Sequence, residues 1–96
     1  MSTIQIKTPS PDESLPLVKE ALEMEKKLTR DSLKTSEDRI AALTRQLGVT
    51  PAQVLESTVA RTEVNEQALL ELEGELELRR TLQDTLRHLD QLEVCL

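Results

Sequence analysis

The sequence predicts an all-α fold, a long antiparallel helical hairpin that dimerises into a four-helix bundle and carries a short N-terminal arm or strand. The 96 residues contain no Phe, Trp or Tyr, so the side chains that usually fill a compact core are missing. Leucine dominates the apolar residues and 31% of the chain is charged, which is typical of long helices packed side by side, as in coiled coils. Gly48 and Pro51, near the middle of the chain, divide this helical sequence into two segments.

The predicted N-terminal arm covers residues 1–11. Polar and apolar residues alternate from Thr3 to Lys7, which is the period of a short strand, and the prolines that follow end the pattern. Ser10 and Asp12 are both suitable N-cap residues. We therefore expect the first helix to cover residues 12–47.

The first helix and the turn after it carry clear local signals. No Gly or Pro occurs in residues 17–47, and the apolar residues recur at three- and four-residue steps. Gly48 is placed as a helix C-cap, while Thr50 and Pro51 are placed as the N-cap and first residue of a second helix. Because the turn over residues 48–50 is so short, we expect the second helix to return antiparallel to the first.

The second helix is predicted to cover residues 51–91, followed by a short tail over residues 92–96. Its leucines cover more of the helix surface than one partner helix can bury, which predicts an interface with a further chain. The residues expected in this interface are Leu69, Leu72, Leu76, Leu78, Leu82, Leu86 and Leu89. The tail alternates like a strand, and whether it pairs with the N-terminal segment is left open.

Composition also restricts the function classes. The formal net charge of -6 argues against nucleic-acid binding, which draws most of its affinity from Lys and Arg. No stretch approaches the apolar length of a membrane span, and the first ten residues lack the apolar run of a signal peptide, so we expect a cytoplasmic protein. The single Cys95 excludes an intrachain disulfide.

No constellation of residues predicts chemistry. His88 is the only histidine and has no nucleophile or second metal ligand near it in the sequence. The acidic run from Glu66 to Glu77 includes like-charged pairs four residues apart, but it lacks the carboxylate and histidine spacing of di-iron bundles. We therefore expect no enzyme activity, no cofactor and no metal, and the role of the acidic run stays open.

The stretch EKKLTRDSLKTSEDRIAALTRQLGVTPAQVLE and the later LLELEGELELRRTL resemble a loose group of small, uncharacterised prokaryotic helical-hairpin proteins, some of them antitoxin-like partners of small toxins. This resemblance implies a non-enzymatic protein–protein interaction module that binds and sequesters another protein. The partner's identity and the number of chains in the assembly stay open, with a homodimer expected.

The opening Thr3-Ile4-Gln5-Ile6-Lys7, followed by a helix, is also similar to the start of ribbon-helix-helix regulators, whose strands pair across a dimer and bind DNA. The predicted helices are much longer than those regulators use, and the chain is acidic. A DNA-binding regulator that uses the N-terminal arm is therefore the alternative function.

Overall fold

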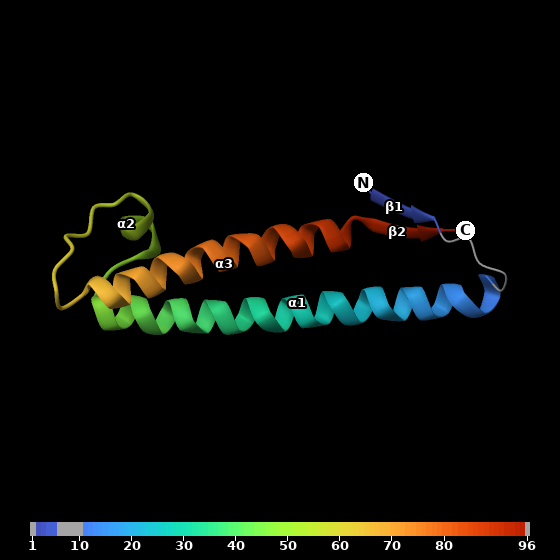
Figure 1. Ribbon diagram of the computed structural model, residues 1–96, viewed down its shortest axis with the longest axis horizontal. Helices are drawn as coiled ribbons and strands as arrows, with labels where there is room; N and C mark the ends of the chain where they lie inside the picture. The colour runs from blue at the N-terminus through green and yellow to red at the C-terminus, as the bar shows by residue number, and fades with distance from the viewer. Residues whose placement is uncertain (1, 6–10, 96) are drawn as a thin grey trace.

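The computed structural model describes residues 2–5 and 11–95 and forms a long, narrow helical hairpin. Its elements in chain order are β1 (Ser2–Gln5), α1 (Pro11–Leu47), α2 (Pro51–Leu55), α3 (Glu66–Asp90) and β2 (Leu92–Cys95). The helices α1 and α3 lie antiparallel along a molecule that measures 61 × 20 × 16 Å (Figure 1). The predicted all-α helical hairpin is confirmed.

The face of α1 that meets α3 follows a seam of alternating three- and four-residue steps. Residues on this seam are buried or half-buried, whereas most others on α1 are exposed. This spacing is the one that keeps one side of a helix against a neighbour along its whole length. The seam consists of Leu22, Lys26, Thr29, Leu33, Ser36, Ile40, Leu43 and Leu47.

The turn after α1 has the predicted structure. Gly48 has a φ angle of +66°, in the left-handed region that glycine adopts without steric cost. The Thr50 hydroxyl accepts a hydrogen bond from the backbone N–H of Gln53, whose side-chain oxygen accepts one from the Thr50 N–H in return. Pro51 is the first residue of α2, so all three predicted turn residues, Gly48, Thr50 and Pro51, are confirmed.

The prediction of one continuous helix over residues 51–91 is wrong, because α2 ends at Leu55 and α3 begins at Glu66. Ser57 stops α2 by adopting a φ angle of +57°, and the N–H of Thr58 then bonds back to the carbonyl of Gln53. Residues 58–65, which follow, include two Thr and two Val, residue types with lower helix propensity than Ala or Leu. The connection between α1 and the antiparallel helix α3 therefore covers residues 48–65, rather than residues 48–50 alone.

The core lies at the closed end of the hairpin, where three helices meet. Its buried members are Ile40 from α1, Val54 from α2, and Leu69, Leu72 and Leu76 from α3. The short α2 packs against α3 and so covers leucines that α1 cannot reach (Figure 1). The break in the second helix thus supplies the third layer that completes this core.

The two strands pair at the opposite, open end of the hairpin. They run parallel, with Ser2 opposite Leu92 and Gln5 opposite Cys95. The sequence left this pairing open, and the structure shows that it forms. The predicted tail begins as β2, and the arm predicted over residues 1–11 contains β1, although residues 1 and 6–10 of the arm and the last residue of the tail lie outside the described residues.

Candidate interaction surfaces

The leucines predicted to form an interface between chains differ in burial and divide into three sets. Leu69, Leu72 and Leu76 are buried inside the hairpin core. The exposed fraction of Leu78 is 43%, and it is the most exposed of the seven. The remaining three, Leu82, Leu86 and Leu89, are half-buried along the open half of α3.

A polar contact fixes the pairing of α1 with α3 at mid-length. The buried hydroxyl of Ser36 donates a hydrogen bond to Oε2 of Glu75 at 2.9 Å, and Nη1 of Arg39 lies 3.3 Å from Oε1 of the same carboxylate. A buried polar group that has one suitable partner penalises any slip of the two helices, because a slip would leave the group unpaired. Toward the open end, Arg30 pairs with Asp90 across the helices at 3.4 Å.

The acidic run on α3 is largely neutralised within the chain. Glu73 pairs with Arg61, Glu75 pairs with Arg39, and Glu77 pairs with Arg80. Hydrogen bonding from the Arg80 guanidinium, with its positive charge, holds the pKa of the exposed Glu77 carboxyl below its usual value. Glu71 accepts a hydrogen bond from the side-chain amide of Gln67. The carboxylates therefore have separate partners around the helix.

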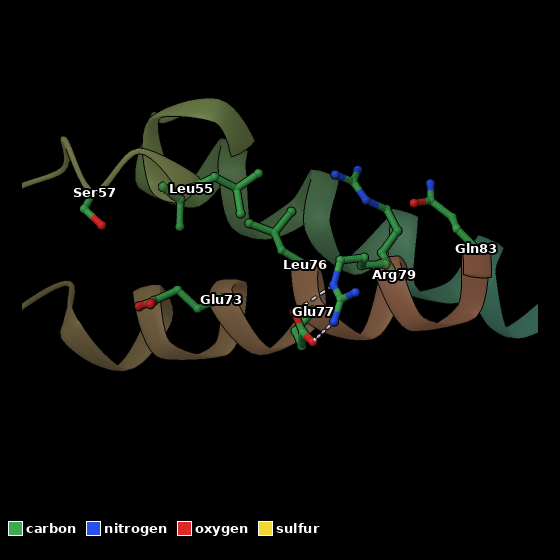
Figure 2. A pocket seen from close by; sticks show the side chains of 9 residues that line it. Leu55, Ser57, Glu73, Leu76, Glu77, Arg79 and Gln83 are labelled. Atoms are coloured by element: carbon green, nitrogen blue, oxygen red, sulfur yellow. Dashed lines mark hydrogen bonds and ion pairs between the residues drawn. The ribbon is translucent and has the colours of Figure 1, made fainter. Parts of the chain in front are cut away.

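One hollow lies between α2 and α3 (Figure 2). Val54, Leu55 and Leu76 are its apolar lining residues, and Glu77 and Arg80, which form an ion pair, also line it. Arg79 and Gln83 extend from α3 beside α2 (Figure 2). Among the described residues that line this hollow, Ser57 carries the one hydroxyl, and there is no imidazole or thiol to activate it. The two carboxylates that line it, Glu73 and Glu77, each pair with an arginine.

A second concave surface runs along the contact between α1 and α3, and we call it the α1–α3 groove. It comprises two open hollows of about 420 and 460 Å³ that share Arg39. The α3 residues that line it lie on a different helix face from those beside α2. The groove is lined by Leu28, Asp31, Ser32, Thr35, Ser36, Arg39, Ala42 and Leu43 from α1 and by Glu71, Gly74, Glu75, Leu78 and Leu82 from α3.

The chemistry of the groove suits a helix better than a small molecule. It is open to solvent along its length, whereas small-molecule sites enclose most of their ligand. Gly74 contributes no side chain to the groove, and nothing lies within 4 Å of the Cβ that an alanine would add there. Leu78 supplies exposed apolar surface on the same side. These features match a groove that receives the apolar face of another helix.

The remaining candidates for chemistry do not form a site. His88 is exposed near the end of α3. In residues 2–5 and 11–95, no three His, Cys, Asp or Glu side chains converge in a way that would hold a metal ion. Within the same described part of the chain, no helix combines the length and apolarity needed to cross a membrane.

Sequence reasoning missed the polar contact at mid-seam and the groove beside it. The signal for Ser36 was its place in the three- and four-residue repeat between Leu33 and Ile40, which marks it as facing α3. Its partner Glu75 could not be identified, because that pairing depends on how α3 is aligned along α1.

Comparisons with known proteins give no further guide. A scan against protein-family models finds no match, and searches of curated proteins and of solved structures find no similar protein. Function must therefore be argued from the surfaces of the hairpin.

Proposed function

We propose that this chain is a non-enzymatic protein–protein interaction module, which binds an amphipathic helix of another protein in the α1–α3 groove. The observation that carries the proposal is the groove itself, with Leu78 exposed beside Gly74 and with polar side chains at its margins. An apolar strip with a polar rim is the usual anatomy of a helix-binding surface.

Charge favours a basic partner. The chain carries 18 acidic and 12 basic residues, and the residues that line the groove include Asp31 and Glu71. Complementary charge speeds association and disfavours acidic competitors. Sequestration of a basic protein, as the resemblance to antitoxin-like hairpins implies, is the concrete form of this proposal, with the module acting as a homodimer.

The DNA-binding alternative has less support. β1 pairs in parallel with β2 of its own chain, whereas the strands of ribbon-helix-helix regulators pair across a dimer. The acidic balance of the chain also opposes contact with phosphates. We therefore do not propose it.

The test is affinity capture from the source organism with three forms of the full chain as bait. Leu78→Glu places a charge in the groove, and Gln83→Glu places the same charge on the α2 side of the same helix. We expect one basic protein to bind the wild type and Gln83→Glu in a fixed ratio and to be lost with Leu78→Glu. Equal capture by all three baits, or no specific capture, would contradict the proposal.

A further inference from the structure

The first half of α1 carries an exposed apolar stripe that is separate from its seam with α3. Leu17, Ala21, Met24 and Leu28 follow at steps of four, three and four residues, so they share one face of the helix. The exposed fractions of Leu17, Met24 and Leu28 are 66%, 53% and 52%. Half or more of each of these large side chains is therefore in contact with water, which is unusual for a row of apolar residues on one helix face.

The stripe follows the heptad pattern of a coiled coil. Leu17 and Met24 occupy d positions, and Ala21 and Leu28 occupy a positions. Seam residues of α1 such as Leu22 and Thr29 lie roughly a third of a turn away, where they meet α3. Another helix can therefore pack on the stripe without displacing α3.

Two exposed charges on one side of the stripe identify the occupant. Glu20 precedes Ala21 and Lys27 precedes Leu28, so both occupy g positions of successive heptads. In the described part of the chain, none of the intrachain ion pairs uses either residue. The sequence continues the order outward with Glu13 and Lys34, giving acid, acid, base, base at heptad spacing.

This charge order is complementary to itself only when the two helices are antiparallel. In an antiparallel pair the g positions face each other, so Glu20 of each copy meets Lys27 of the other. In a parallel pair g faces e, which would place Glu20 against Glu25 of the second copy, a like-charge contact. The apolar residues also fit the antiparallel arrangement, because it places Leu17 of one copy against Leu28 of the other and Ala21 against Met24.

We infer that two copies of this chain dimerise through antiparallel α1 helices, with a two-fold axis between residues 22 and 23. The inference rests on the homodimer of the proposed function and names the surface through which the two copies associate. The contact is isologous, so every apolar layer and ion pair occurs twice. Leu28 also lines the α1–α3 groove, so the contact borders the groove at that residue. Arg39, Ala42 and Gly74 line the groove farther toward the closed end and lie outside the contact.

The test measures mass in solution by sedimentation equilibrium, using the full chain at about 50 µM. The wild type should have twice the chain mass of 10.8 kDa. Glu20→Lys and Lys27→Glu each replace two attractive contacts with two repulsive ones, and we expect each to weaken its homodimer roughly tenfold or more. Both positions are exposed, so circular dichroism should show intact helices.

The two variants have opposite charge patterns, so an equimolar mixture should form the heterodimer at least as tightly as the wild type forms its homodimer. Lys19→Glu makes the same charge change on α1 but away from the stripe, and it should leave the dimer unchanged. High salt should weaken the wild-type dimer and strengthen the homodimer of each variant.

A wild type of 10.8 kDa at this concentration would overturn the inference, and so would homodimers of Glu20→Lys as tight as those of the wild type. Binding of a different protein that is lost on substituting Leu17 in a chain that stays monomeric would assign the stripe to that protein instead. Capture of a partner through Leu78 is a separate readout, so failure of the dimer and failure of the proposed function are distinguishable.

Discussion

The closed and open halves of the hairpin contain similar residues but bury them to different degrees. At the closed end, α2 lies over α3, and Leu69, Leu72 and Leu76 are buried. At the open end, where no third helix covers α1 and α3 in the described chain, Leu82 and Leu86 are half-buried. Two helices can bury only the stripe between them, so a complete core needs a third element. The closed half obtains this element from its own chain, and we infer that in the open half a second copy covers the exposed stripe on α1.

The largest expected effect is a loss of stability on truncating a core leucine of the closed half. Leu72 has no exposed surface, so Leu72→Ala should lower the free energy of unfolding by about 3 kcal/mol. Leu86→Ala makes the same chemical change at a half-buried position and should cost about 1 kcal/mol. Urea unfolding of both variants measures the difference, and equal losses would show that the two halves are packed alike.

An intermediate effect comes from the two glycines, whose substitutions should have opposite signs. Gly48→Ala forces a left-handed backbone on a residue with a Cβ and should destabilise the turn by about 1 kcal/mol. Gly74 is helical with open space around it, so Gly74→Ala should stabilise the isolated chain by roughly 0.5–1 kcal/mol. Thermal unfolding measures both changes, and a destabilised Gly74→Ala variant would reveal a contact at that position.

The smallest expected effect concerns the exposed ion pair between Glu77 and Arg80 on α3. Because the pKa of Glu77 is lowered in the folded chain, its contribution to stability is present above the ordinary carboxyl pKa of 4.5 and is lost as the pH falls through the lowered value. An NMR titration should show this low pKa in the wild type, and Arg80→Ala should return it to the ordinary value. A pKa unaffected by Arg80→Ala would show that the ion pair does not form in solution.

The sequence predicts those parts of the fold that depend on neighbouring residues. Gly48, Thr50 and Pro51 form a turn because each residue acts on the few residues beside it. The end of α2 was missed because Ser57, rather than a glycine, takes the left-handed conformation. The start of α3 was missed because Thr62 and Asn65 share reciprocal side-chain hydrogen bonds, a pattern that also occurs inside polar helices.

The candidate surfaces were only partly predictable, for a different reason. The spacing of Leu69, Leu72 and Leu76 shows that they face one way, but which neighbour covers them depends on the fold of residues 56–65, far from any local signal. The excess of apolar surface on the second helix was interpreted as an interface with a further chain, but Leu69, Leu72 and Leu76 are buried in a core that α1 and α2 of the same chain complete. The exposed stripe on α1 was not recognised, since its residues were not assigned to a separate face.

Amide hydrogen exchange as a function of protein concentration tests most directly the claim that a second copy covers the α1 stripe of the open half. Raising the concentration of the wild type should slow exchange in residues 17–28 of α1, while exchange in residues 69–76, whose leucines Leu69, Leu72 and Leu76 are already buried by their own chain, should not change. The same concentration series on Lys27→Glu should leave both segments unchanged. Exchange in residues 17–28 that is independent of concentration in the wild type would contradict the account.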